Sequence, residues 1–397
     1  MPKAKTEKVE RTELSLGKVR ELREKMGEKK KSRFKLPKGA VIVEELPTEE
    51  IHKKIHETSR ELLLQVEKKM PPVIEIPQRG GDNIIYDEEN DLLLLGAGKS
   101  ARALLSLATS SDVARTMRVL ELIHTLVEKD IHATKREIFY NDVNLFKDQL
   151  YSDKIIDDIP PLLSTTRDST HVVASAKGMA IGRLVIRDSG DTIDLTKLGS
   201  GGWSITPFLD KIKIVESDAE FVLVVEKDAA LIRLSEAKWW NKVPCIIITG
   251  KGSADIATRS FLRKMVRTLK IPAFALMDSD PYGMYIYSVY LRGSKRLSYE
   301  SPFLATPELK LLGVLSRDLD KYNIPKECWL KMTDKDVKRA KELLKEPFVQ
   351  KNEQWTEDLK LMIDLKRKAE IQALSSHGFE YLTETYLPQK LTTGDWF

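Results

Sequence analysis

Cysteine is scarce in this sequence of 397 residues, which contains only Cys245 and Cys328. Two cysteines cannot build a disulfide framework or the paired-cysteine motif of a structural zinc site. The chain also lacks a run of the ~18 apolar residues that a membrane-spanning helix requires, and its charged start has no apolar signal-peptide core. These absences exclude a disulfide-stapled secreted domain and a membrane protein, and we expect a cytoplasmic protein.

A complete nucleotide-binding loop is absent as well. Residues 92–100 read LLLLGAGKS and imitate a P-loop, but Leu93 stands where that motif has its first glycine. Without this glycine the backbone cannot wrap the phosphates. We therefore expect a linker here, and we expect any ATP that the system uses to bind elsewhere.

Positive charge is concentrated at the start of the chain. Residues 1–40 hold 14 Lys and Arg against 6 Asp and Glu, a charge of +8, which leaves −3 for the remaining residues out of a total of +5. Few large apolar residues occur here, so residues 1–47 are predicted to be a basic, largely disordered arm with a fluctuating helix around residues 16–26. Such an arm either contacts nucleic acid electrostatically or is a solvated tail.

The pattern of residues 48–195 predicts a helical region with short strands. An amphipathic helix ends at Pro71 and Pro72, and residues 73–76 and 84–86 then read as a hairpin within a segment spanning residues 48–98. In residues 99–195, a helix over 111–129, a second from Thr134 and a third around 160–173 precede a hairpin of residues 183–187 and 192–195. Three helices and a hairpin are typical of a winged helix, which binds DNA.

Within this region, Arg136 and Tyr140 are four residues apart and share one face of the second helix. A phenol can attack a phosphate, and a neighbouring guanidinium can bind the charge that develops. The alternative from the pattern alone is a core tyrosine beside a surface arginine. Lys135, Lys177 and Arg183 are the candidate DNA contacts.

Acidic side chains follow two apolar runs in the second half of the chain. Glu226 comes directly after residues 221–225, and Asp278 and Asp280 follow residues 273–277. Strands that alternate with helices predict a parallel sheet, whose carboxyl ends meet at one edge. Converging carboxylates require a compensating positive charge. Carboxylate oxygens are ligands that Mg²⁺ prefers, so Mg²⁺ is the expected cation. The alternative is a solvated acidic turn.

These residues resemble a known family. An acidic residue after one strand and Asp-x-Asp after a later one are similar to the Toprim fold, and the segments VVEKDAA, IITGKG and ALMDSDPYG resemble the A subunit of type IIB DNA topoisomerase VI. The stretch TKREIFYNDVNLF is similar to the catalytic-tyrosine motif of that family, and GSKRLSYESPFLATPELKLLGV also matches. Ser253 and Ala254, which follow the turn at residues 250–252, stand where the family is expected to have an aromatic residue and a proline. This departure affects only the expected shape of that loop.

The resemblance implies a fold and a mechanism. The fold class would be α/β plus winged helix, with a CAP-like winged-helix domain at 99–195, a linker at 196–214 and a Toprim domain at 215–397. The glycine-rich residues 199–202 themselves predict the hinge of that linker. Tyr140, assisted by Arg136, would form a 5′-phosphotyrosine link with double-stranded DNA. Glu226, Asp278 and Asp280 would bind Mg²⁺.

The resemblance also implies partners. Two copies of the chain would form a homodimer, and an ATPase B subunit would complete an A₂B₂ enzyme that relaxes and decatenates DNA at the nucleoid. Two alternatives remain from the residues alone, namely a Toprim metal-dependent nuclease that uses water, and a non-catalytic winged-helix DNA-binding protein.

Overall fold

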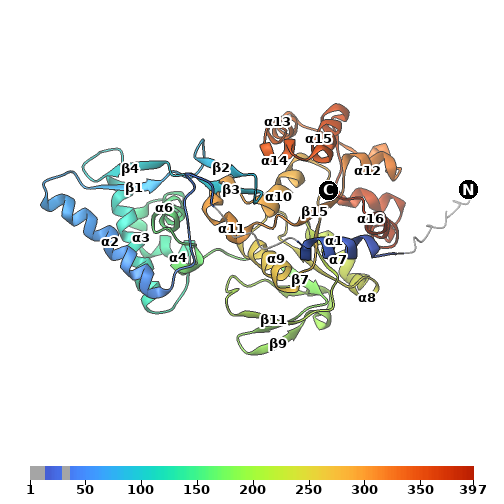
Figure 1. Ribbon diagram of the computed structural model, residues 1–397, viewed down its shortest axis with the longest axis horizontal. Helices are drawn as coiled ribbons and strands as arrows, with labels where there is room; N and C mark the ends of the chain where they lie inside the picture. Colours follow the sequence, from blue (N-terminus) through green and yellow to red (C-terminus); the bar gives the residue numbers. More distant parts are fainter. Residues whose placement is uncertain (1–13, 29–35) are drawn as a thin grey trace, which may run out of the picture. The chain divides into compact units, whose positions relative to one another are not determined.

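The computed structural model describes residues 14–28 and 36–397. The chain divides into two compact units, and neither is one continuous stretch (Figure 1). The first unit contains Met1–Arg33, Ala176–Arg292 and Leu304–Phe397, and the second contains Phe34–Ser175 and Gly293–Phe303. No helix within the described ranges is long and apolar enough to cross a membrane.

A six-stranded sheet forms the centre of the first unit, with the strand order β10-β7-β13-β12-β14-β15. Four strands are parallel: β12 (Phe221–Val225), β13 (Cys245–Thr249), β14 (Ala273–Leu276) and β15 (Leu309–Gly313). Every residue of β12, β13 and β14 is buried, as expected for apolar runs covered on both faces. The predicted parallel sheet is therefore confirmed.

Helices cover this sheet, and two short antiparallel strands extend it. The elements are α7 (Asp228–Glu236), α9 (Ile256–Leu269), α10 (Pro281–Arg292), β7 (Met179–Gly182) and β10 (Trp203–Ser204). Helix α9 is strongly amphipathic, and its Phe261 and Leu262 are fully buried. Helix α7 follows β12 and α10 follows β14. The short connections between each strand and its helix carry Glu226 and Asp278.

The hairpin that was predicted as a wing belongs to the first unit. Strands β8 (Val185–Asp188) and β9 (Asp191–Asp194) pair as predicted, but β8 also pairs with β11 (Ile212–Glu216) to give a separate three-stranded sheet. Ile186 and Ile212 on these strands are fully buried. Residues 183–195 are therefore not the wing of the helical unit, because the second edge of β8 pairs with β11, which begins in the segment that was predicted to be a linker.

The glycine-rich segment predicted as a hinge also lies inside the first unit. Gly202 has φ +62°, and a Cβ at this position would lie 2.9 Å from the carbonyl oxygen of Ala180. The next residue, Trp203, pairs with Ala180 in the main sheet. Only glycine permits this close approach, so the segment is fixed against the sheet and does not link the two units.

Part of the basic arm forms a packed helix. Residues 14–28 contain helix α1 (Gly17–Glu28), and Val19 is 1% exposed within the core that also includes strand β12. The backbone N–H of Ser15 donates to Thr392, and Arg20 pairs with Glu220 at 2.6 Å. The helix predicted around residues 16–26 is present, but it is packed rather than fluctuating, because Leu16, Val19 and Leu22 form one apolar face. Residues 1–13 and 29–35 lie outside the described residues.

The C-terminal part of the first unit is mostly helical. Its longer helices are α12 (Ser316–Lys321), α13 (Asp334–Leu343), α15 (Glu353–Leu365) and α16 (Leu387–Thr393), with the short α14 (Pro347–Gln350) between α13 and α15. Strands β16 (Leu330–Lys331) and β17 (Arg367–Lys368) pair beside them. Helix α1 packs on α16.

The second unit is built on helices around one apolar core. These are α2 (Thr48–Glu67), α3 (Ser110–Glu128), α4 (Lys135–Asn141), α5 (Val143–Phe146) and α6 (Gln149–Leu162). The third predicted helix was placed too late in the chain. Asp148 caps the start of α6, and Pro160 and Pro161 lie in its last turn rather than at its beginning.

Four strands in this unit pair differently from the prediction. Strand β2 (Ile84–Asp87) pairs with β3 (Leu92–Leu95), whereas β1 (Val73–Pro77) pairs with β4 (Lys99–Ala103). The predicted hairpin of residues 73–76 and 84–86 was therefore wrong, because the later strands supply the partners. Lys99 and Ser100 of the P-loop-like stretch lie in β4. The two-residue strands β5 (Ala133–Thr134) and β6 (Val172–Val173) pair in parallel.

Residues 293–303 complete this second unit, although they come from the middle of the Toprim-like half of the chain. Leu297, Tyr299 and Phe303 pack against Val43 and Leu95 in a small apolar cluster. Polar contacts add to this packing.

An ion pair and a hydrogen bond fix the same segment. Arg296 pairs with the buried Asp157 on α6, and the backbone N–H of Arg167 donates to the carboxylate of Glu300. The segment is thus held by charge as well as by apolar contacts.

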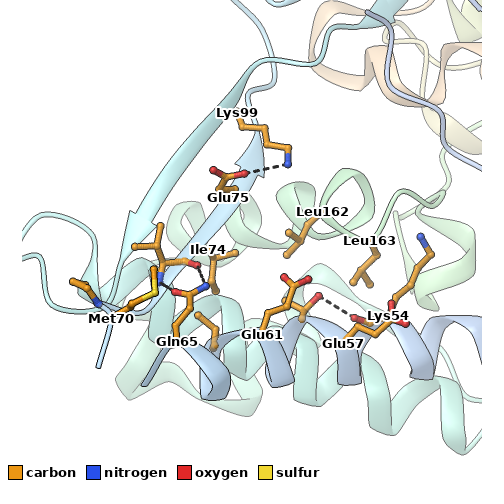
Figure 2. A pocket seen from close by; sticks show the side chains of 14 residues that line it. Lys54, Glu57, Glu61, Gln65, Met70, Ile74, Glu75, Lys99, Leu162 and Leu163 are labelled. Atoms are coloured by element: carbon orange, nitrogen blue, oxygen red, sulfur yellow. Dashed lines mark hydrogen bonds and ion pairs between the residues drawn. The ribbon is translucent and has the colours of Figure 1, made fainter. Parts of the chain in front are cut away.

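A cavity of about 550 Å³ lies between α2 and β1 in the second unit (Figure 2). Gln65 closes one side by bonding both backbone groups of Val73, at 2.7 and 3.2 Å. The carboxylates that line it, Glu57, Glu61 and Glu75, are exposed, and Glu75 pairs with Lys99 across the two strands. Its charges are mixed and solvated, so the cavity offers no poised group for chemistry.

Candidate active site

Glu226 and Asp278 lie together at the carboxyl ends of two neighbouring parallel strands, β12 and β14. The Glu226 carboxylate accepts a hydrogen bond of 2.9 Å from the backbone N–H of Asp278. Both residues are buried, at 7% and 4% exposure. The predicted convergence of these two carboxylates is therefore present, because the parallel register places both strand ends at one edge.

Burial controls the charge of this pair. Desolvation, followed by the charge of Asp278, raises the pKa of Glu226 to about 8. Desolvation also raises the pKa of Asp278, against the opposing effects of Lys227 and a backbone N–H from Ile371. Two buried carboxyl groups side by side resist ionisation, and a nearby positive charge would favour it.

Asp280 plays a different part in the structure. Its carboxylate accepts a 2.6 Å hydrogen bond from the backbone N–H of Gly283 in the first turn of α10, and the side chain is half-buried. A Cβ on Gly283 would lie 2.5 Å from the Asp278 carbonyl oxygen and 3.0 Å from a Glu226 carboxylate oxygen. The glycine therefore allows α10 to start directly against the acidic pair.

Two residues that the sequence prediction missed complete this site. The Lys227 ammonium lies 2.7 Å from the Asp278 carboxylate and 3.0 Å from that of Glu370. Glu370 belongs to a distant segment, and its neighbour Ile371 donates a 2.9 Å hydrogen bond to Asp278. Lys227 could have been suspected because it follows Glu226, but nothing local in the sequence connects Glu370 with the site.

The donors at this edge fit a hard divalent cation. Across residues 14–28 and 36–397, no three His, Cys, Asp or Glu side chains are already arranged as a metal centre. The available ligands are nevertheless carboxylate oxygens, which Mg²⁺ prefers. A cation would also offset the burial that raises the pKa values of Glu226 and Asp278. Glu226 and Asp278, with Asp280 beside them, are the residues that would hold it.

Tyr140 lies on the surface of the second unit, on the short helix α4. Thr134 caps this helix through a reciprocal box with Glu137, and the buried Ile138 anchors it to the core. The tyrosine is 63% exposed, and its ring lies 5.3 Å from that of Phe139. Arg136 is exposed on the same helix. The phenol and the guanidinium are therefore both accessible to solvent.

The end of α4 is held by one arginine of α3. Arg118 donates a 2.8 Å hydrogen bond to the Asn141 side chain and lies 3.5 Å from the Asp142 carboxylate. Both partners directly follow Tyr140 in the chain. The backbone that carries the phenol is therefore fixed at its two ends, by the cap at Thr134 and by Arg118.

The three candidate DNA contacts have different surroundings. Lys135 pairs with Asp157 on α6, its side chain is only 19% exposed, and desolvation lowers its pKa. Arg183 pairs with Asp218 and donates to the carbonyl oxygen of Trp240 at 2.6 Å. Lys177 is exposed. Lys135 and Arg183 thus have structural partners within their own units.

Three family models match successive parts of the chain. Residues 111–172 match "Type IIB DNA topoisomerase", and residues 177–218 match "All-beta domain in DNA topoisomerase VI alpha subunit". Residues 221–391 match the Toprim domain that the A subunit of topoisomerase 6 shares with Spo11. The second range contains all three strands of the small antiparallel sheet, β8, β9 and β11. The matched boundaries therefore agree with the observed place of the hairpin outside the helical unit.

Several curated proteins are similar over most of the chain. The A3 subunit of DNA topoisomerase 6 from Oryza sativa subsp. indica is 51% identical over 321 residues, covering 81% of this chain and 73% of that protein. The A subunit of type 2 DNA topoisomerase 6 from Aeropyrum pernix is 38% identical over 372 residues, covering 88% and 95%. The human meiotic recombination protein SPO11 is 38% identical over 282 residues, covering 70% and 71%.

Proposed function

Because the chain belongs to the family of type IIB DNA topoisomerase VI A subunits and Spo11 proteins, we propose that it cleaves double-stranded DNA through a covalent tyrosine link. The observation that carries the proposal is the buried pair Glu226 and Asp278, joined by a 2.9 Å hydrogen bond at the strand ends of a Toprim domain. A chain that also exposes Tyr140 on a capped helix has both a nucleophile and a site for phosphate chemistry.

The chemical step is a transesterification. The Tyr140 oxygen attacks the scissile phosphorus, a tyrosine–phosphate bond forms at the 5′ end, and the bond to the 3′ oxygen breaks. The phenol loses a proton and the departing 3′ oxygen gains a proton, so the step neither consumes nor releases protons overall. Because a phosphodiester replaces a phosphodiester, attack by the 3′ hydroxyl can reverse it without ATP.

The chain's residues have separate roles in this step. Arg136 binds the phosphate near Tyr140 and the charge that develops on it. Glu226, Asp278 and Asp280 would hold Mg²⁺, which when bound supplies a Lewis acid for the scissile phosphate and the departing oxygen. Asp280 is half-buried and also caps α10, so we expect it to contribute less to holding the cation than Glu226 and Asp278 do.

Larger assemblies follow from the same proposal. Two copies of this chain form a homodimer that cuts both strands, with the tyrosine of one copy serving the acidic site of the other. The helices α3, α4 and α6 bind the duplex in the manner of a winged-helix domain, although the hairpin predicted as its wing lies in the first unit. The proposed DNA contacts are Lys135 on α4 and, from the first unit, Lys177 and Arg183. An ATPase B subunit completes an A₂B₂ enzyme that relaxes and decatenates DNA at the nucleoid.

The test is denaturing electrophoresis of end-labelled DNA after reaction with the full chain, an ATPase partner and Mg²⁺. The expected result is protein covalently attached to 5′ ends, and its absence from Tyr140→Phe. Cleavage without an adduct, unchanged in Tyr140→Phe, would replace the proposal with hydrolysis by water.

A further inference from the structure

We propose that Lys227 is the internal counter-ion of the metal-free acidic site, and that Glu370 holds this lysine when a divalent cation takes its place on Asp278. The inference rests on the proposed function, because it concerns the cation that this function requires. It assigns a role to two residues outside the predicted set of Glu226, Asp278 and Asp280.

The contacts of Asp278 carry the first step. One carboxylate oxygen accepts the 2.9 Å hydrogen bond from the backbone of Ile371, and the other lies 2.7 Å from the ammonium of Lys227. Both oxygens of a residue that is 4% exposed are therefore engaged. A cation that binds Asp278 must compete with Lys227 for the second oxygen, because two positive charges at one carboxylate repel each other.

The position of Glu370 carries the second step. Its neighbour Ala369 forms two backbone hydrogen bonds with Ser279, of 2.8 and 3.0 Å, and Ile371 bonds Asp278. Glu370 is thus held between two fixed residues beside the site. Its carboxylate already lies 3.0 Å from Lys227 and is 51% exposed, so it can retain the lysine without being displaced itself.

Lys227 suits this exchange because it touches both carboxylates at once. It follows Glu226 directly, its side chain is 31% exposed, and it can move away from Asp278 while keeping its bond to Glu370. The two residues are positioning residues, since they set which charge neutralises Asp278 before DNA is cut.

The test measures binding of Mn²⁺ to the full chain, following free Mn²⁺ by electron paramagnetic resonance without DNA. Mn²⁺ binds the same oxygen ligands as Mg²⁺, generally more tightly. Lys227→Met removes the competing charge and should tighten Mn²⁺ binding on the order of tenfold, the effect of one charge-assisted contact. Lys227→Arg keeps the charge and should bind Mn²⁺ within about twofold of the unmodified chain.

Glu370→Gln should have the opposite effect, weakening Mn²⁺ binding about threefold, because Lys227 then has only Asp278 to neutralise. In the Lys227→Met background the same change should have little further effect, which is the coupling expected if Glu370 acts through Lys227. Lys251→Met is the matched control. Lys251 precedes Gly252, whose backbone N–H donates to the carbonyl oxygen of Glu226. Lys251 itself pairs with Asp228 at 3.8 Å, so its removal should change Mn²⁺ affinity far less.

The outcomes separate this inference from the proposed function. If neither the unmodified chain nor Lys227→Met binds Mn²⁺, the proposed metal chemistry fails and the inference fails with it. If Glu226→Ala abolishes binding but Lys227→Met and Lys251→Met give equal affinities, the metal site stands and the inference alone is overturned. Thermal unfolding in chelator confirms that each variant is folded before its affinity is compared.

Discussion

The acidic site and the tyrosine helix are built in opposite ways. Glu226 and Asp278 are 7% and 4% exposed and are bonded to main-chain groups, whereas Tyr140 is 63% exposed on a helix of seven residues. In the first region, the side chains that would perform chemistry also accept hydrogen bonds from buried main-chain groups. In the second, the reactive side chain contributes little to the fold. Substitutions should therefore separate activity from stability at Tyr140 but not at Asp278.

The sharpest test of this difference is Tyr140→Phe. Covalent attachment to DNA should fall below detection, because the attacking oxygen is removed. The free energy of unfolding should change by less than about 0.5 kcal/mol, since an exposed hydroxyl leaves no cavity. Gel analysis of adducts and urea unfolding measure the two effects, with Tyr282→Phe, another half-exposed tyrosine, as the control. Adducts formed by Tyr140→Phe would move the nucleophile elsewhere.

Asp278→Ala should lower both quantities together. Cleavage should fall about 100-fold or more, because a ligand for the cation is lost. The free energy of unfolding should fall by roughly 2 kcal/mol, since the buried N–H of Ile371 loses its acceptor. Asp280→Ala is the matched comparison and should be milder in cleavage, because Asp280 is half-buried and caps a helix. A variant at Asp278 with full stability would contradict the comparison.

Two deletions at the N-terminus should likewise separate an effect on stability from an effect on DNA binding. Removal of residues 1–28 should lower the free energy of unfolding by about 2 kcal/mol, because the buried Val19 leaves the core of the first unit. Removal of residues 1–13 should leave stability unchanged and instead weaken DNA binding, with a shallower dependence on salt. An unchanged salt slope would mean that these first residues do not touch DNA.

The remaining test is a pH dependence of stability in chelator. The pKa of Glu226 is raised to about 8 in the folded protein, above its ordinary value of 4.5. A raised carboxyl pKa means that ionisation disfavours the fold, so stability is lost as pH rises from about 4.5 to about 8, at no more than about 1.4 kcal/mol per pH unit. Glu226→Gln should flatten this part of the profile in urea unfolding. An unaltered profile would contradict the burial-driven shift.

Local patterns in the sequence predicted the parts of the molecule that depend on neighbours in the chain. The apolar runs before Glu226 and Asp278 indicated buried strands, and their alternation with helices indicated a parallel sheet. Thr134 marked the start of the helix that carries Tyr140. In each case the deciding residues lie within a few positions of one another.

The errors concern pairing at a distance. Strand β8 could form its hairpin with β9, but nothing local showed that β11 would cover its other edge. Glu370 reaches Lys227 through a chain segment far from β12, and helix α1 finds its apolar partners on α16. These contacts depend on which distant strands and helices become neighbours in the folded protein. A short stretch of sequence does not contain that information.

The inserted segment at residues 293–303 has a consequence for how the protein is made. A ribosome that has released residues up to 175 has delivered most of the second unit, yet Arg296, Tyr299 and Glu300 have not been synthesised. Until they emerge, the cluster around Val43 and Leu95 lacks its aromatic partner, and Asp157 lacks one of its cations. The nascent helical unit must therefore wait for more than a hundred further residues of translation, so the tyrosine helix reaches its final surroundings only after strands β12 and β14 have left the ribosome.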